Sequence, residues 1–514
     1  MLKLSKMKLR WIYIMIIIGT SCGKDYLNVL PEDVITTPIF WQTKRDIDMG
    51  LSGCYTVLRD SYIYGLGPTL FDVTPDGNPI FSPAEESIAN GAVDPGLGGL
   101  LGERWTSCYT MIYRTNYFLE NYGRVKNLSQ NEMATYKGQA YFLRGIAYSL
   151  LASTYGGGPV LTKTITPEEA KSIKRASLEE TWNRAVSDFD TAIVNLGITT
   201  PDIGRATKGA ALGMKMRALL YQNKYSEVLK TIGEIEKLNI YALFPSYEGL
   251  FKQANENNKE VLFDVQNIGG PNNLGGRRFN YLLPDFGGAG GCLSAPTGNL
   301  VSQYEMANGG LIDPANPYQG RDPRLNFTVI LPGTPIGSYI FGTTAKPHVA
   351  QQVSEFGVRK YSDILVNGTA PQPDQAALNF IVLRYADVIL AKAESLIETD
   401  QDINNAILLI NMIRTGRNDV KIKPLPMNLI KTEARAALRH ERRVEFACEG
   451  TIYWEDIRRW EIGPQIYPID IYDGHGHVFL TRYKNKYTVA KDKYLPIPGT
   501  EIALNPNLVQ NPGW

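Results

Sequence analysis

The chain has 514 residues, of which 20% are charged, and its formal net charge at pH 7 is +1. Because the charges nearly cancel and no long basic or acidic run appears, the sequence predicts no nucleic-acid partner and no attraction to an anionic surface. At roughly 150 residues per domain the length would suggest three domains. A chain of this length that is built from structural repeats would instead form a single domain.

The first 21 residues have the layout of a secretory signal. Basic residues precede an apolar run at 11–18, which is too short for the roughly 20 residues of a membrane-spanning helix. Small residues then lead to Cys22, as in bacterial lipoprotein signals, although Gly19 stands where many of these have leucine or valine. We expect cleavage before Cys22, acyl chains on its sulfur and a protein that sits on a membrane without crossing it. An ordinary signal peptide with an incidental cysteine is the alternative.

The remaining cysteines are widely spaced and form no Cys-x-x-Cys motif. They are Cys54, Cys108, Cys292 and Cys448. We expect buried, unpaired side chains rather than a disulfide framework.

The strongest helical patterns come in pairs. Residues 129–155 and 177–197 carry apolar side chains at three- and four-residue steps, and Ser177 with Glu180 forms a capping box. Residues 204–238 predict two helices that break near 222–224, and further helices are expected at 383–398, 403–415 and 429–449. A bulky helix alternating with one rich in alanine and glycine is typical of tetratricopeptide-like repeats. Trp41, Trp105, Trp182 and Trp454 lie in such patterns or in family motifs and are predicted to be core.

Two stretches, 60–102 and 269–361, have no sustained helical period and are rich in glycine, proline, asparagine and aromatic residues. Loops of this length in a compact protein are usually functional or disordered, and the aromatic residues argue against disorder.

Several segments, read in order, resemble the SusD/RagB family of outer-membrane lipoproteins. They include "CGKDYLNVLPED" from Cys22, "YRTNYFLEN", "AYFLRGIAYSLLASTYGGGPVLT", "RDPRLNFTV", "LRYADVILAKAESLIE", "ERRVEFACEGTIYWEDIRRW" and "LPIPGTEIALNPNLVQNPGW". The resemblance implies a mainly α protein: a tetratricopeptide-like scaffold of four helix pairs, with long irregular insertions that form a ligand face. It also implies one SusD-like domain over 22–514, with an N-terminal part at about 22–225 and a C-terminal part at about 260–514.

The same resemblance implies the function. It predicts a lipid-anchored protein on the outer face of the outer membrane that passes an oligosaccharide, or sometimes a peptide, to a SusC-like TonB-dependent transporter. It implies neither catalysis nor a cofactor, and no metal site is predicted.

Sugar binding needs aromatic rings for the apolar face of a pyranose and polar groups for its hydroxyls. Two loop stretches offer both, "FDVTPDGNPIF" and "GGRRFNYLLPDF". The candidate ligand residues are Asp76, Asn78, Phe81, Arg277, Arg278, Asn280, Tyr281, Asp285 and Phe286. For each of them, packing within the loop remains the alternative.

Enzymatic alternatives are poorly supported. His440 and Glu441 begin a zinc-protease motif, but Val444 stands where the second histidine ligand belongs. Glu441, Glu445 and Glu449 share one helix face, so they cannot flank a glycosidic bond, and the neighbouring arginines 439, 442 and 443 favour an ion-pair network. Asp473, His475 and His477 could bind a metal, but we interpret them as a surface loop. A surface glycoside hydrolase and a scaffold for protein assembly remain alternatives.

Overall fold

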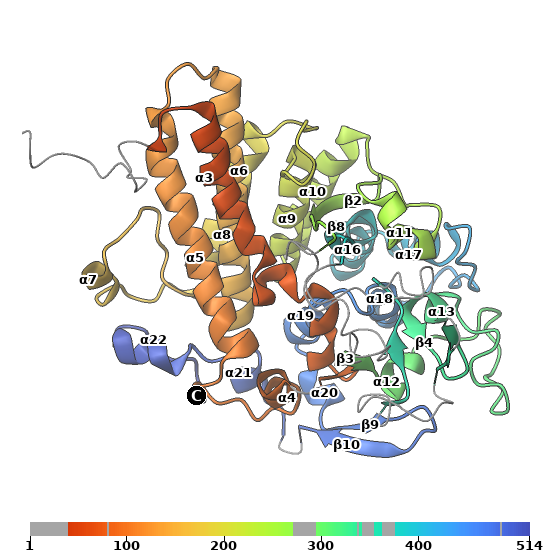
Figure 1. The fold of residues 1–514 in the computed structure, drawn as a ribbon. Coiled ribbons are helices and arrows are strands. Elements are labelled where there is room, and N and C mark those ends of the chain that lie inside the picture. The colour runs from red at the N-terminus through yellow and green to blue at the C-terminus, as the bar shows by residue number, and fades with distance from the viewer. Residues whose placement is uncertain are drawn as a thin grey trace, which may run out of the picture.

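The computed structural model describes residues 40–79, 82–270, 294–336, 339–341, 354–361, 376–483 and 486–514. The molecule has two layers. Long helices form one layer, and short helices, strands and irregular segments form the other (Figure 1). The prediction of a mainly α fold with irregular insertions is therefore confirmed.

The long helices form four successive pairs: α5 with α6, α8 with α9, α10 with α16, and α17 with α18. Each helix also packs on the next one along the chain. The bounds are α5 Gly99–Asn121, α6 Gln130–Tyr155, α8 Leu178–Asn195, α9 Lys208–Tyr221, α10 Tyr225–Leu238, α16 Tyr385–Glu398, α17 Ile403–Thr415 and α18 Lys431–Glu445. The helices predicted from periodicity are all present, and the Ser177–Glu180 capping box is formed.

Two helices, α3 (Lys44–Tyr55) and α5, were not among those predicted from periodicity. In α5, the buried polar residues Arg104, Thr115 and Asn116 interrupt the apolar stripe. In α3, only three of the twelve residues are buried, so few positions carry the pattern. A buried face that contains polar residues, or one that is short, lacks the clean period that reveals an amphipathic helix.

The second layer consists of short elements. The helices are α4 Pro83–Ala89, α11 Tyr247–Leu250, α12 Gly298–Val301, α13 Arg324–Thr328, α19 Ile452–Arg459, α20 Gly463–Ile466, α21 Val489–Asp492 and α22 Gly499–Leu504, with α7 Pro167–Ala170 on the scaffold side. Turns of 3₁₀ or π type cover Thr56–Arg59, Ser61–Gly65, Gly67–Val73, Tyr122–Arg124 and Gln253–Asn255.

The strands pair only two at a time, and each described pair is antiparallel. The pairs are β1 (Gly77–Pro79) with β3 (Ser294–Pro296), β2 (Val261–Val265) with β8 (Phe380–Arg384), β4 (Val329–Ile330) with β7 (Gly357–Val358), β5 (Pro335–Ile336) with β6 (Tyr339–Ile340), and β9 (Ile469–Tyr472) with β10 (Val478–Arg482).

Helix α19 joins the two layers by packing against several scaffold helices at once. Glu455 accepts a hydrogen bond from Ser153 of α6, and Asp456 pairs with Arg442 of α18. Arg459 pairs with Glu394 of α16 and lies over the ring of Tyr221 of α9. The inner side of the scaffold is therefore occupied by a segment of the chain itself.

The four tryptophans predicted to be core are 2–6% exposed. Cys54, Cys108 and Cys448 are buried and unpaired, as predicted, and Cys292 lies outside the described residues. Among the helices that the structure describes, none combines the length and apolarity needed to span a bilayer.

Candidate functional site

The short ladder between β1 and β3 includes part of the first stretch predicted to bind ligand. Pro79, two residues before Phe81, pairs with Ser294, which follows Phe286 by eight residues along the chain. Phe81 and the second stretch, from Arg277 to Phe286, lie outside the described residues. The ligand contacts of both stretches therefore stay predictions.

Asp76 precedes β1 and is only 3% exposed. Both of its carboxylate oxygens accept hydrogen bonds from Arg443 of α18, with Nε at 3.0 Å from each oxygen. This geometry favours a role in fixing β1 to the scaffold over direct ligand contact. Asn78, within β1, is 9% exposed and pairs with Ala295.

A second arginine also contacts this strand. The buried guanidinium of Arg482, from β10, donates to the backbone carbonyl of Gly77 at 2.7 Å and to that of Thr74. Gly77 itself permits close packing on the preceding turn, because a Cβ there would lie 2.7 Å from the Cα of Asp72. Side-chain and backbone contacts therefore fix β1, which belongs to the first ligand stretch.

Asp72 lies beneath this ladder with its carboxyl group buried. The Ser294 hydroxyl donates to its Oδ2 at 2.5 Å. Burial raises the pKa of Asp72 to about 8, against the opposing effect of that hydrogen bond. Near neutral pH, Asp72 thus places an uncharged carboxyl group beside Ser294, the first residue of β3.

The glutamates of α18 and the turn after it belong to a buried ion network, as predicted. Glu445 contacts three arginines, namely Arg324 at 2.7 Å, Arg384 at 2.7 Å and Arg417 at 2.9 Å. Glu441 pairs with Arg324 and Arg414, and Glu449 pairs with Arg384 and Lys360. These carboxylates are occupied by cations, so they fit a structural role.

The partners predicted for these glutamates were wrong. Arg442 pairs with Asp387 and Asp456, Arg443 with Asp76, and Arg439 lies over the ring of Trp460. Consecutive residues of a helix point about 100° apart, so the arginines beside the glutamates face other elements. The partners of the glutamates come instead from α13, β8, the end of α17 and residue 360.

His440, the first residue of the broken zinc motif, contacts the carbonyl of Gln303 through its Nε2 at 2.8 Å. Val444 is fully buried. In the loop 473–477, the nearest carboxylate of His475 is Glu355 at 3.1 Å, and that of His477 is Asp473 at 3.3 Å. Both imidazoles are largely exposed, and no metal-binding cluster occurs among the described residues.

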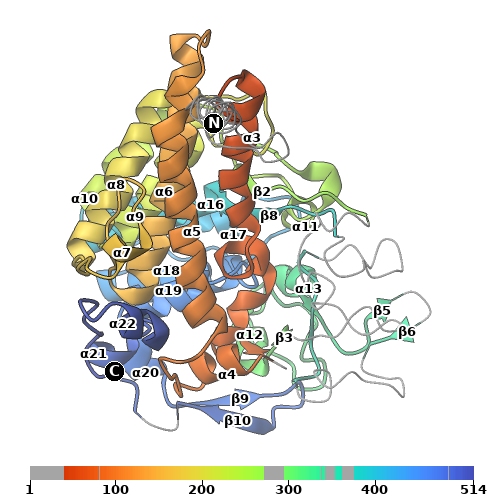
Figure 2. The ribbon, with the colours of Figure 1, turned by 60° about the vertical axis from the view of Figure 1, so that its left-hand side comes forward.

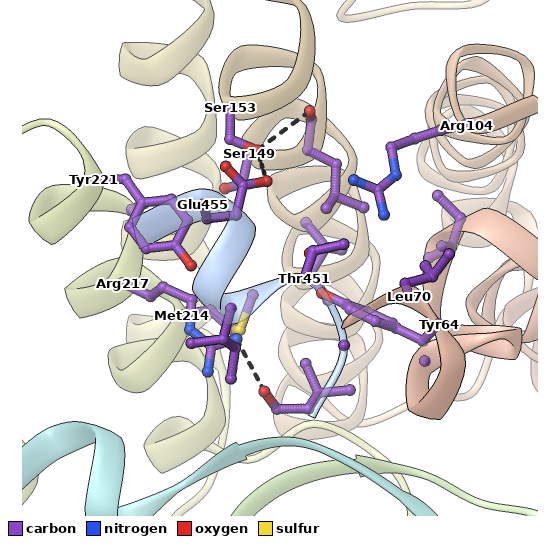
Figure 3. Close-up of a pocket in the computed structure, with 18 of the residues that line it drawn as sticks. Tyr64, Leu70, Arg104, Ser149, Ser153, Met214, Arg217, Tyr221, Thr451 and Glu455 are labelled. Atoms are coloured by element: carbon purple, nitrogen blue, oxygen red, sulfur yellow. Dashed lines mark hydrogen bonds between the residues drawn. The ribbon is translucent and has the colours of Figure 1, made fainter. Parts of the chain in front are cut away.

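A cavity of about 70 Å³ lies between the scaffold and the second layer. Figure 3 shows Ser149, Ser153 and Tyr221 on one side of it and Tyr64 and Leu70 on another. Pockets for small ligands usually measure about 300–1,000 Å³. This cavity is therefore too small to hold an oligosaccharide.

Comparisons with known proteins cover both halves of the chain. The model of the SusD family matches residues 253–514, and a model described as "Starch-binding associating with outer membrane" matches residues 25–220. A SusD-like protein of Formosa agariphila is 24% identical, over 97% of this chain and 97% of its own length.

Solved structures agree with this match. A SusD-like protein from Bacteroides fragilis is 26% identical with a TM-score of 0.79, covering 92% of this chain and 98% of its own. A second protein from that species, described as a SusD-like carbohydrate binding protein, is 24% identical with a TM-score of 0.81, covering 91% and 100%.

Proposed function

Because this chain belongs to the SusD family, we propose that it is a cell-surface lipoprotein that binds an oligosaccharide and delivers it to a SusC-like TonB-dependent transporter. Cys22 carries the lipid anchor, and the protein faces the exterior of the outer membrane. The observation that carries the proposal is the family match over residues 253–514, joined by the starch-binding description of the model that matches 25–220.

The β1–β3 ladder supports a glycan site at one defined place. The first stretch, at 71–81, includes β1, and the second, at 275–286, precedes β3 by a few residues along the chain. Together they offer aromatic, amide, carboxylate and guanidinium groups. Aromatic rings suit the apolar faces of pyranoses, and the polar groups suit their hydroxyls. Arg443 and Arg482 hold β1 in place, so a ligand would meet a site whose base is already ordered.

In this scheme, transport depends on the ligand making different contacts with the open and the closed state of the lipoprotein–transporter pair. A ligand that touches both lipoprotein and transporter favours the closed pair, because a ligand shifts an equilibrium only through its different affinities for the two states. Motion of the transporter then releases the ligand into the channel. The lipoprotein performs no covalent step in this scheme.

The rival functions have less support. A scaffold for protein assembly would use the inner side of the helical repeats, but α19 fills that side through its contacts with α6, α16 and α18. A hydrolase would need two carboxyl groups about 5–9.5 Å apart across a cleft, whereas the glutamates of α18 are buried in ion pairs. Peptide binding remains the second candidate, since aromatic and arginine side chains suit both ligand classes.

A glycan panel tests the proposal. We expect native electrophoresis through gels containing individual polysaccharides to retard the purified protein in at least one gel, with no shortening of that polysaccharide. Cleavage of the glycan would favour the hydrolase. Binding to peptides and to no glycan in the panel would favour the second candidate.

A further inference from the structure

One end of the scaffold carries an unusual set of exposed aliphatic side chains. We define this N-terminal end by the first turns of α3, the turn 122–129 between α5 and α6, and the turn 196–207 between α8 and α9. Figures 1 and 2 show the start of α3 at the end of the molecule opposite to the C-terminus, α21 and α22.

The exposed residues cluster around the α8–α9 turn. Val194 is 79% exposed, Ile198 47% and Ile203 72%, and Met49 on the outer side of α3 is 49% exposed. A single exposed aliphatic residue is ordinary, but turns are usually rich in polar residues and glycine. Three β-branched side chains turned to solvent within ten residues therefore suggest a surface that is covered in the working protein.

Contacts pack this turn against α3. Arg205 donates to the Ser52 hydroxyl at 2.9 Å, and its guanidinium lies 4.5 Å from the ring centre of Tyr55. The Ala206 amide donates to the Tyr55 hydroxyl at 2.9 Å. Ser52 lies about two turns from the start of α3, and Tyr55 is its last residue, so these contacts pack the end of the turn against the C-terminal half of α3.

Contacts with α6 place the start of the α8–α9 turn near the first turn of α3. The amine of Lys44, in the first turn of α3, donates to the Tyr136 hydroxyl at 2.5 Å. Half a turn farther along α6, Gly138 packs against Leu196, where a Cβ would come within 2.9 Å of that side chain. The exposed turn thus begins within a few residues of the contact between α3 and α6.

The chain before α3 indicates what covers this surface. Eighteen residue steps separate Cys22, the proposed lipid attachment, from Phe40, the first described residue. A chain of that length spans at most about 60 Å when fully extended. The proposed anchor is therefore tied to the chain end that leads into α3, within about 60 Å of Phe40.

We propose that the N-terminal end rests on the lipid surface, with Val194, Ile198 and Ile203 in contact with the boundary between headgroups and acyl chains. Aliphatic side chains beside a covalent lipid add contact area, and two such signals hold a protein more firmly than one. This inference rests on the lipid anchor of the proposed function. The β1–β3 ladder lies towards the opposite end (Figures 1 and 2), so the ligand stretches would be held away from the anchored end.

Hydrogen exchange on vesicles tests the proposal. Residues 22–514, carrying Cys292→Ser, are coupled through Cys22 to a maleimide lipid in vesicles of phosphatidylethanolamine with a minority of phosphatidylglycerol. The backbone amides of 194–206 should exchange about fivefold or more slowly on the vesicles than in solution, because lipid contact restricts opening of the turn and access of water. The amides of 498–505, at the opposite end, should keep their rates.

Two double variants control for this result. Ile198→Ser with Ile203→Ser should return the exchange of 194–206 to its rate in solution. Leu408→Ser with Ile430→Ser replaces side chains that are 57% and 63% exposed on and beside the α17–α18 pair, and it should leave the protection unchanged.

The proposal is overturned if 194–206 exchanges equally fast with and without vesicles, if both double variants act alike, or if protection appears only after the transporter is added. The chemical coupling makes this test independent of acylation in the cell and of glycan binding. Failure of the proposed anchor would show separately, as a Cys22 without added lipid mass in the protein isolated from membranes.

Discussion

The helical scaffold and the loop-rich layer are stabilised by different interactions. Between α6 and α8 many contacts are apolar and close, as where the ring of Phe189 packs against Gly145, beside one buried ion pair between Arg144 and Asp188. The junction between α18 and the second layer instead buries a network of carboxylates and guanidinium groups, in which Glu445 alone contacts three arginines. Regular helices can bury an apolar stripe, whereas irregular segments without a shared period must be tied at single points by strong polar contacts.

The largest effect is expected at Glu445. Glu445→Ala leaves Arg324, Arg384 and Arg417 without a shared buried partner, and it should lower the free energy of unfolding by about 5 kcal/mol. Denaturant unfolding measures this, with Glu234→Ala on the exposed face of α10 as the control. A loss below about 1 kcal/mol would mean that the network contributes little to the layer.

The scaffold should respond to the loss of apolar contact. Phe189→Ala opens a cavity between α6 and α8 and should cost about 3–4 kcal/mol in the same measurement. This loss should not depend on pH between 3 and 7, because no titrating group is removed. A loss at Phe189 that disappeared in acid would contradict the contrast between the two regions.

Acid should also weaken the buried ion pairs that join scaffold helices, such as those of Asp387 on α16 with Arg217 on α9 and Arg442 on α18. Burial alone would raise the pKa of Asp387, but Arg217 and Arg442 lower it to about 2. The stability that Asp387 contributes is therefore present above its ordinary pKa near 4 and is lost as the pH falls towards 2. Unfolding measured at stepped pH should show this loss, and Asp387→Asn should flatten it. An unchanged slope in that variant would remove Asp387 from the explanation.

A smaller effect on stability is expected at the ladder. Asp76→Asn weakens the contact with Arg443 and should cost about 1–2 kcal/mol of stability. It should also reduce glycan affinity, because β1 positions one of the ligand stretches. Asp190→Asn, which breaks the more exposed pair with Lys215 on the scaffold, is the matched control and should leave affinity unchanged. Equal glycan affinity in both variants would mean that the ladder does not affect ligand binding.

The same contrast explains what could be predicted from the sequence. The helices of the repeat show their apolar period locally, so α6, α8 and α9 were predictable residue by residue. The pairing of Arg324 with Glu441 joins residues 117 positions apart, and that of Arg443 with Asp76 joins residues 367 apart. Nothing local distinguishes Asp76 in such a pair from an exposed aspartate in a ligand loop. Its assignment as a candidate ligand residue followed from composition, whereas its burial is a tertiary property.

The central claim is that the two stretches at 71–81 and 275–286 bind a glycan. The most direct measurement is calorimetric titration of a glycan retained in the panel into Tyr281→Ala and Phe286→Ala proteins, beside Tyr113→Ala, which removes a half-exposed aromatic ring from α5. We predict a loss of about tenfold or more in affinity for at least one of the first two variants, since stacking on a sugar face is removed, and no loss for Tyr113→Ala. Unchanged affinity in both loop variants, or an equal loss in all three, would contradict the account.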